Sequence, residues 1–436
     1  MVSLGPPYQG YLYAYPHKTA YRPLEPRPRL ADVWAGEDTT SLFLYTHIPY
    51  CEMRCGFCNL FTRAAPPHEQ VTAYLAQLRR QARQVAAALP GARYARAAIG
   101  GGTPTYLTAP ELTELFDLLE AATGVDFQPV PLSVETSPAT ATADRLAVLN
   151  ERGATRISIG VQSFLDAEAH AAGRPQRRAE VERALDAIRA AGPAGLNIDL
   201  IYGIPGQTRA TWDESLSAAL RWAPEELYLY PLYVRPLTGL GRRETADGSD
   251  PDWDAQRLEL YRHAVSRLAA EGYEQLSMRQ FRRPTTQSTP PDDYCCQDDG
   301  MVGLGCGARS YTTALHYSFD YAVGVRHVRG ILDDYLARPA VDFDVAEVGF
   351  ALDAGERRRR WLLKSLLRAE GVDAAAYAAR FGTAVDDDFP ALESLRTAGY
   401  AEGHRLTADG LARSDAIGPW LISGGVRAAM AGHVTR

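Results

Sequence analysis

Short apolar runs alternate with longer amphipathic segments over the first half of the chain. Six runs predict buried strands at residues 42–46, 94–99, 131–135, 155–159, 196–200 and 226–230. Between them, segments near 68–89, 109–122, 142–150, 177–191 and 208–222 predict helices. Alternating β and α units indicate a parallel sheet with right-handed crossovers. The pattern therefore predicts an α/β fold in which six units form an open, partial (β/α)6 barrel.

The segments that flank this core have other patterns. Residues 1–40 are rich in Tyr, Pro and Arg, which favours an ordered arm wrapped on the body over a disordered tail. Residues 241–345 show no clear period and predict an irregular extension of the core at 41–240. Residues 346–436 predict helices followed by a short hairpin, a winged-helix-like unit in which Arg357–Arg360 form a solvated helix face.

Composition narrows the class of protein. The chain has 436 residues, 46% of them hydrophobic, and a formal net charge of −7. It contains no run of eighteen apolar residues, and its first residues lack the basic and apolar regions of a signal peptide. Net acidity gives no support for nucleic acid as the main partner. We therefore expect a cytoplasmic monomer that binds neither membrane nor nucleic acid.

The candidate chemistry begins with three cysteines directly after the first strand. Cys51, Cys55 and Cys58 are separated by three and then two residues. Three thiolates can hold three irons of a [4Fe–4S] cube and leave the fourth iron open, whereas clusters that only carry electrons usually have four cysteines. A structural zinc site would need a fourth Cys or His at short spacing. Core cysteines are the other alternative, but a polar loop that contains glycine is an unusual place for them.

This spacing resembles that of the radical S-adenosylmethionine (SAM) enzymes. The resemblance implies that the open iron binds the amino and carboxylate groups of SAM. It also implies that an electron from the cluster cleaves SAM to a 5′-deoxyadenosyl radical. An electron donor such as flavodoxin or ferredoxin is the expected partner, and a small molecule or a peptide is the expected substrate.

Polar residues at the ends of the next strands fit a ligand at the same edge of the sheet. The run from Gly100 to Thr103 ends the second strand and allows close backbone approach to a ligand. Glu135, Gln162 and Asp199 lie at or near the ends of the third, fourth and fifth strands. A carboxylate in an apolar strand is costly to bury without a partner, and SAM offers hydroxyl groups and an ammonium. A structural hydrogen bond or ion pair is the alternative for each.

Several longer motifs resemble oxygen-independent coproporphyrinogen III oxidase and its relatives, a group that includes heme chaperones and class C radical SAM methyltransferases. The motifs are Tyr45–Cys51, the glycine run, Gly160–Phe164, Gly173-Arg174 and Asn197–Pro205. By resemblance, Cys51, Cys55 and Cys58 hold the cluster, Tyr45 and Phe57 contact SAM, and Ile201 lines a second SAM site. The residues expected to bind the first SAM are Gly101, Gly102, Thr103, Glu135, Gln162, Arg174 and Asp199.

The chain departs from this family at two places. Leu60 stands where the oxidase has a fourth cysteine, and residues 291–297 replace the pattern of the heme chaperones. Cys295, Cys296 and Cys306 lie in or near this second segment. They are candidate hydrogen donors to a substrate radical, with apolar core packing or a second cluster as alternatives.

The expected function is radical modification of a small or peptidic substrate. Methyl transfer with two SAM molecules is the favoured reaction. The other reactions need only one SAM, so we expect one or two bound SAM molecules. Oxidative decarboxylation of a propionate is next. A heme-binding chaperone that keeps the cluster but performs no turnover is the alternative from a different class.

Overall fold

The computed structural model describes residues 3–192, 195–242, 250–284 and 300–433. At its centre lie six parallel strands, which are neighbours in chain order. They are β2 (Leu42–Ile48), β5 (Tyr94–Gly101), β6 (Leu132–Thr136), β7 (Ala154–Gln162), β8 (Gly195–Tyr202) and β9 (Glu226–Pro231). All six strands match the sequence prediction, and the sheet has two free edges, so the barrel is open.

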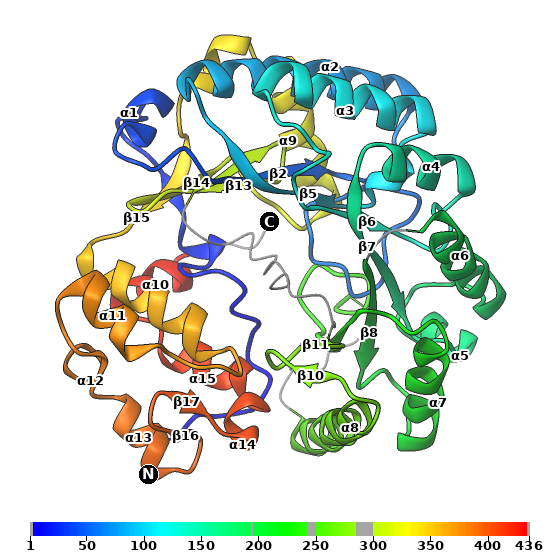
Figure 1. Cartoon of the computed structure of the whole chain (residues 1–436), viewed down its shortest axis with the longest axis vertical. Coiled ribbons are helices and arrows are strands. Elements are labelled where there is room, and N and C mark those ends of the chain that lie inside the picture. Colours follow the sequence, from blue (N-terminus) through cyan, green and yellow to red (C-terminus); the bar gives the residue numbers. More distant parts are fainter. Residues whose placement is uncertain (1–2, 193–194, 243–249, 285–299, 434–436) are drawn as a thin grey trace.

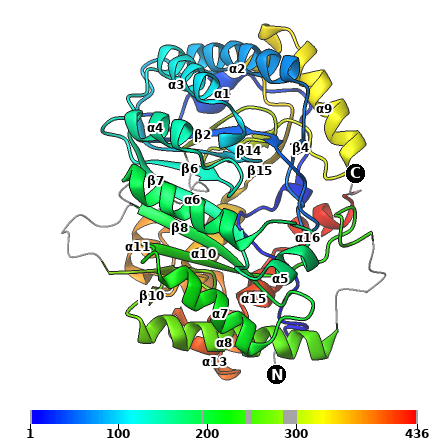
Figure 2. The ribbon, with the colours of Figure 1, turned by 90° about the vertical axis from the view of Figure 1, so that its right-hand side faces the viewer.

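Helices cover the outer face of this sheet (Figures 1 and 2). They are α2 (His68–Ala88), α3 (Ala109–Thr123), α4 (Ala143–Glu151), α5 (Asp166–Ala171), α6 (Arg178–Ala191) and α7 (Arg209–Leu220). Strand β2 contributes side chains to both faces of the sheet. Its residues Leu42, Leu44 and Ile48 are buried in the main core. Phe43 packs in a separate cluster with Ala14 of the N-terminal arm. Successive side chains of a strand point to opposite faces, so one strand serves both layers.

The extension is more regular than its sequence predicts. It contains the long helix α8 (Pro251–Ala270) and the helix α9 (Val325–Ala337). Strand β12 (Met301–Leu304) pairs in parallel with β2, and β13 (Arg309–Tyr311) and β14 (Leu315–Ser318) continue the sheet. Strands β15 (Val348–Ala351) and β1 (Arg22–Pro23) complete that edge, and β11 (Gln280–Arg282) and β10 (Glu274–Gln275) form the other. One sheet therefore takes strands from all four sequence segments.

The C-terminal unit has its own hydrophobic core. Its helices are α10 (Ala354–Leu366), α11 (Ala374–Phe381), α12 (Val385–Asp388) and α13 (Leu392–Thr397). The hairpin of β16 (Ala401–Glu402) and β17 (Arg405–Leu406) follows, then α14 (Ala408–Leu411), α15 (Ser414–Trp420) and α16 (Gly424–Ala431). This order of helices and hairpin agrees with the predicted winged-helix-like unit.

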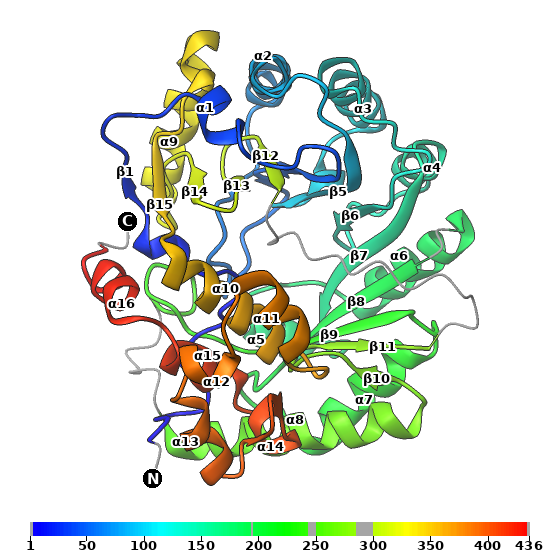
Figure 3. The same ribbon diagram turned by 60° about the vertical axis from the view of Figure 1, so that its left-hand side comes forward.

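The N-terminal arm is ordered, as predicted. It runs between the C-terminal helices and the sheet before it reaches α1 (Leu30–Trp34) (Figures 1 and 3). Tyr15 is buried in the core of the C-terminal unit, while Tyr8 contacts the ring of Tyr202 on β8 at a centroid distance of 6.2 Å. The arm thus joins the two parts by aromatic packing.

No helix in the described parts of the chain combines the length and apolar character that a bilayer-spanning segment needs.

Candidate active site

The three cysteines lie on one loop at the carboxyl end of β2. Cys51 ends the short strand β3 (Tyr50–Cys51), which pairs with β4 (Arg63–Ala64) and so closes the base of the loop. Cys51, Cys55 and Cys58 are half-buried free thiols. Within the described residues, no three His, Cys, Asp or Glu side chains converge as a single metal ion would require. A [4Fe–4S] cube would need one thiolate for each of three irons, which three cysteines can supply.

Two polar side chains stabilise the thiols. The Thr103 hydroxyl donates to the sulfur of Cys51 at 3.5 Å, and the Arg174 guanidinium donates to the sulfur of Cys55 at 3.4 Å. Burial raises the pKa of Cys51 to about 12 and also raises the pKa of Cys55, against the effect of these donors. Because a coordinating metal deprotonates a thiol, bound iron would supply the positive charge that these buried sulfurs lack. The loop therefore fits an iron–sulfur cluster.

Backbone contacts clamp the cysteine loop from outside. The Gly56 N–H donates to the Gly173 carbonyl at 3.0 Å, and the Leu240 N–H donates to the Gly56 carbonyl at 2.8 Å. A Cβ on Gly56 would lie 2.8 Å from the Ala172 carbonyl oxygen, so only glycine fits there. Sequence reasoning missed Gly56, although a glycine between two candidate ligands was a visible signal.

The glycine run lies directly against the same loop. The Gly102 N–H donates to Ile48 and the Thr103 N–H donates to Tyr50, both at 2.7 Å. Gly101 has a φ of +112°, and a Cβ there would lie 2.4 Å from the ring of His47. Burial lowers the pKa of His47 to about 4, so the ring is neutral at pH 7. The run and the loop are therefore packed without space for a side chain at Gly101.

The two strand-end carboxylates lie on neighbouring parts of the parallel sheet, Glu135 on β6 and Asp199 on β8. The Gly101 N–H donates to the Glu135 carboxylate at 3.1 Å, and the Asn197 amide donates to Asp199 at 2.7 Å. The Glu135 side chain is exposed, yet burial among protein atoms raises its pKa. Burial also raises the pKa of Asp199 to about 7, with Glu135 adding to the shift. Both carboxyl groups would be more stable as anions beside a cationic ligand.

Gln162 ends β7, and Arg174 lies in the loop between α5 and α6. The strand is bulged between Gly160 and Gln162, and Gln162 has a φ of +70°, a strained value for this residue type. The Arg174 guanidinium also donates to the Gln176 side chain at 2.8 Å. These contacts hold Arg174 beside Cys55, the position from which it could pair with a carboxylate.

The resemblance assigns Phe57, Ile201 and Tyr45 to contacts with SAM, and these residues lie in two separate parts of the structure. Phe57 packs against the apolar cluster that contains Ile201 and Leu240, so the residues assigned to the first and second SAM are close to one another. Tyr45 lies on the inner side of β2, where its hydroxyl contacts the His47 ring nitrogen at 3.3 Å.

Cys306 does not occupy the position that we expected. It lies in the main hydrophobic core with 0% exposure, its N–H donating to the Tyr74 hydroxyl at 3.0 Å, and burial raises its pKa. This position corrects its assignment as a hydrogen donor, because a thiol packed in the core cannot reach a substrate radical. Cys295 and Cys296 lie outside the described residues.

A cavity of about 430 Å³ adjoins the cysteine loop, and sequence reasoning did not predict it. Lys18, Arg309 and Tyr321 are among its lining residues. The Tyr321 hydroxyl donates to the carbonyl of Asn59, next to Cys58, and the Lys18 ammonium lies 3.2 Å from the centre of the Tyr321 ring. The cavity therefore lies near the cysteine loop, and its lining carries basic groups such as Arg309 as well as the acidic groups of Asp320 and Glu347.

The chain is similar to known proteins of one superfamily. Residues 45–219 match the Radical SAM superfamily. The chain is 30% identical over 365 residues to oxygen-independent coproporphyrinogen III oxidase of Cereibacter sphaeroides, an alignment that covers 79% of this chain and 77% of the relative. It is 26% identical to the heme chaperone HemW of Bacillus subtilis, with 80% and 89% covered.

A solved structure, coproporphyrinogen III oxidase (HemN) from Escherichia coli, has the same fold. Its TM-score is 0.78 at 23% identity, with 94% of this chain and 96% of that chain covered. The protein is thus a radical SAM protein, a class that implies a [4Fe–4S] cluster and SAM. Within that superfamily, the chain belongs to the family of oxygen-independent coproporphyrinogen III oxidase.

Proposed function

We propose that the protein cleaves SAM at a cluster held by Cys51, Cys55 and Cys58 and uses the resulting radical to oxidise an anionic substrate. The observation that carries this proposal is the meeting of three thiols, Arg174 and two carboxyl groups of raised pKa at one edge of the sheet. When bound, the cluster supplies one electron to SAM, and SAM supplies a radical that abstracts hydrogen.

The side chains around the loop would bind and orient SAM. Arg174 can pair with the carboxylate of SAM, while Glu135 and Asp199 can accept hydrogen bonds from its ammonium and ribose hydroxyls. The raised pKa of both carboxyl groups means that they gain most from a positively charged ligand.

An anionic substrate fits the cavity beside the cysteine loop. Its lining has more basic than acidic residues, with Arg22, Arg27 and Arg309 against Asp320 and Glu347. Coproporphyrinogen, the substrate in the name of the relatives, carries propionate groups. We favour oxidative decarboxylation of such a chain. One hydrogen atom would pass from the substrate to the 5′-deoxyadenosyl radical, which becomes 5′-deoxyadenosine. The substrate radical would then lose one electron to a one-electron acceptor and release CO₂, so that a vinyl group remains.

Methyl transfer with two SAM molecules, which the sequence favoured, is the second candidate. Its support is the proximity of Phe57 and Ile201 in one apolar cluster, which would make two bound nucleosides neighbours. Heme binding without turnover is the third, supported by the similarity to HemW. A flavodoxin or ferredoxin as electron donor, a monomeric state and a cytoplasmic location are parts of the same proposal.

One anaerobic experiment separates these functions. Reconstituted protein is reduced in the presence of SAM and coproporphyrinogen III, and the products are analysed by mass spectrometry. Oxidative decarboxylation predicts 5′-deoxyadenosine and loss of CO₂ and two hydrogens from each reacting chain. Methyl transfer predicts a product heavier by a methylene, together with S-adenosylhomocysteine. Absence of 5′-deoxyadenosine, with a Soret band after heme addition, would contradict the proposal and support a chaperone.

A further inference from the structure

Lysine is rare in this chain, and one of its lysines lines the cavity beside the cysteine loop. The sequence has 46 Lys and Arg residues, of which only Lys18 and Lys364 are lysine. Lys18 begins a short 3₁₀ helix, η1 (Lys18–Ala20), in the N-terminal arm, and it lines the cavity of about 430 Å³. The arm therefore brings a primary amine to this cavity, in a chain that uses arginine for almost every other cation.

Two contacts place the Lys18 side chain close to the cysteine loop. Its nitrogen lies 3.2 Å from the centre of the Tyr321 ring, and the hydroxyl of the same tyrosine donates to the Asn59 carbonyl. Asn59 follows Cys58 directly in the sequence. One aromatic ring therefore connects the amine to the loop that carries the candidate cluster ligands.

The acidic residues of the lining do not pair with this amine. Within the described parts of the chain, Lys18 forms no ion pair, and the face of the Tyr321 ring is its close contact. Glu347 pairs with Arg338 at 2.7 Å, and Asp320 accepts a hydrogen bond from the N–H of Tyr321 at 2.8 Å. An ammonium that faces only an aromatic ring would be stabilised by an anion in the cavity.

Arg309 lines the same cavity, and a tyrosine is its partner. Its guanidinium donates to the Tyr13 hydroxyl at 2.7 Å and lies 4.9 Å from the centre of that ring. Burial and then the charge of Arg309 lower the pKa of Lys18, while Cys58 acts in the opposite direction. The two basic groups are thus close enough to repel each other, and an anion that contacts both would stabilise both.

The chemistry of lysine suits this position better than that of arginine. A guanidinium stays charged in proteins, whereas a buried ammonium can release its proton. Lys18 can therefore stay buried beside Arg309 without a permanent second charge. An anion that enters the cavity favours the protonated amine and pairs with it.

Aromatic side chains form another part of the lining. Tyr21, Phe319 and Tyr321 all border the cavity, and Tyr21 is buried. Such surfaces pack against an apolar or flat ligand. The cavity therefore suits a molecule with an apolar body and an anionic group at its edge.

We propose that Lys18 and Arg309 together bind an anionic group of the substrate and so hold its apolar body beside the cysteine loop. The inference rests on the proposed function for the reaction, but it concerns substrate binding and not SAM cleavage. Carboxylate and phosphate share the required chemistry, because both accept charge-assisted hydrogen bonds from ammonium and guanidinium groups. Lys18 is then a specificity-determining residue that the N-terminal arm supplies.

The first test measures binding by calorimetry to full-length, cluster-loaded protein without SAM or reductant. The probes are coproporphyrin III, which carries carboxylates, and flavin mononucleotide, which carries a phosphate. Lys18→Met removes the amine and keeps an unbranched apolar side chain, and Lys364→Met is the matched control because it removes the other lysine. We expect at least one probe to bind, with affinity at least tenfold weaker in Lys18→Met and within twofold of wild type in Lys364→Met.

A second measurement on the wild-type protein needs no variant. Acetic anhydride acetylates lysine side chains, and mass spectrometry distinguishes Lys18 from Lys364 because the chain has only these two. A bound probe should slow the acetylation of Lys18 severalfold and leave that of Lys364 unchanged.

The outcomes separate the sources of the anion and the two proposals. Weaker binding of coproporphyrin III to Lys18→Met assigns a carboxylate, and weaker binding of flavin mononucleotide assigns a phosphate. Binding that depends on Lys18, in a protein that forms no 5′-deoxyadenosine from SAM after reduction, would keep the anion site and contradict the proposed function. No binding of either probe, equal affinity in wild type and Lys18→Met, or no protection of Lys18 from acetylation would overturn the inference.

Discussion

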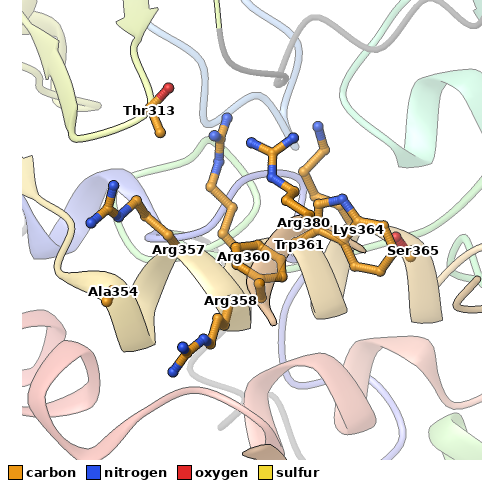
Figure 4. A pocket seen from close by; sticks show the side chains of 10 residues that line it. Thr313, Ala354, Arg357, Arg358, Arg360, Trp361, Lys364, Ser365 and Arg380 are labelled. Carbon is orange, nitrogen blue, oxygen red and sulfur yellow. The ribbon is translucent and has the colours of Figure 1, made fainter. Parts of the chain in front are cut away.

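The cysteine loop and the cavity of the C-terminal unit differ in charge and in the way they are built. At the cysteine loop, three thiols and Arg174 lie at the same edge of the sheet as the carboxyl groups of Glu135 and Asp199. Along α10 and α11, a cavity is lined by four basic side chains and Trp361, while a fifth basic residue, Arg358, pairs with Asp388 (Figure 4). The first arrangement suits a cationic cosubstrate and iron. A net charge of −7 describes neither site, which shows that local charge and not the total decides what a surface can bind.

The construction of the two sites predicts how each responds to substitution. Backbone contacts without space for a side chain hold the cysteine loop, at Gly56 and Gly101 in particular. Rotatable side chains of α10 form most of the lining of the cavity along α10 and α11. Changes at the cysteine loop should therefore affect folding and binding together, whereas changes of exposed side chains along α10 should cost little stability.

The largest expected effect belongs to the cysteine loop. Cys55→Ala should remove the cluster, because thiolates hold its irons, and iron should fall from about four per chain to near zero after reconstitution. Cys306→Ala is the matched control, since that thiol lies in the core, and it should keep its iron. Iron analysis with absorption near 400 nm checks both. A Cys55→Ala protein with full iron would show that the ligands are misassigned.

A backbone substitution should also have a large effect at the first site. Gly101→Ala would place a Cβ 2.4 Å from the His47 ring at a φ of +112°, so the combined strain and overpacking should cost roughly 3 kcal/mol of stability. Gly91→Ala has a φ of +77° but meets no described atom within 4 Å, and should cost about 1 kcal/mol. Denaturant unfolding of both variants measures the difference. Similar losses would mean that the contact with His47 relaxes freely.

Removal of the Arg174 cation should weaken the binding of SAM at the cysteine loop. Arg174→Ala should weaken SAM binding by about 2 kcal/mol, because a charge-assisted pair is lost in a half-buried site. Arg183→Ala, which removes an exposed arginine of α6, should leave the affinity unchanged. Calorimetry with cluster-loaded protein provides the comparison, and iron content should stay the same in both. Wild-type affinity in Arg174→Ala would limit this residue to supporting the loop.

The smallest expected effect concerns pH. Burial raises the pKa of Asp199 from 3.8 to about 7, so the folded protein prefers the neutral acid. The associated stability is fully present below pH 4 and is lost as pH rises to about 7. Asp199→Asn removes this loss, so the variant should gain stability relative to wild type as the pH rises from 4 to 8. Unfolding of cluster-free, SAM-free protein at both pH values tests this, and parallel pH profiles would contradict the raised pKa.

Much of the first site could be predicted because its residues belong to short motifs at strand ends. The cysteine spacing, the glycine run, Glu135 and Asp199 all follow directly from six strands that the hydrophobic pattern identified. The parallel sheet then brings the strand ends together without further information.

The rest depends on contacts between residues far apart in the chain. Strand β12 pairs with β2 across more than 200 residues, and this pairing places Cys306 in the core and not above the loop. The burial of Arg360 depends on Tyr311 of another strand, so four successive arginines alone suggested a solvated face. Periodicity shows which face of an element is polar, but it does not identify what packs against that face.

The central claim is that an open iron of a cluster on Cys51, Cys55 and Cys58 binds SAM. Electron paramagnetic resonance of the anaerobically reduced protein, recorded with and without SAM, tests it most directly. The account predicts a reduced [4Fe–4S] signal whose shape changes when SAM is added and which is absent in Cys55→Ala. A cluster signal that SAM leaves unchanged, in protein with full iron content, would contradict the account.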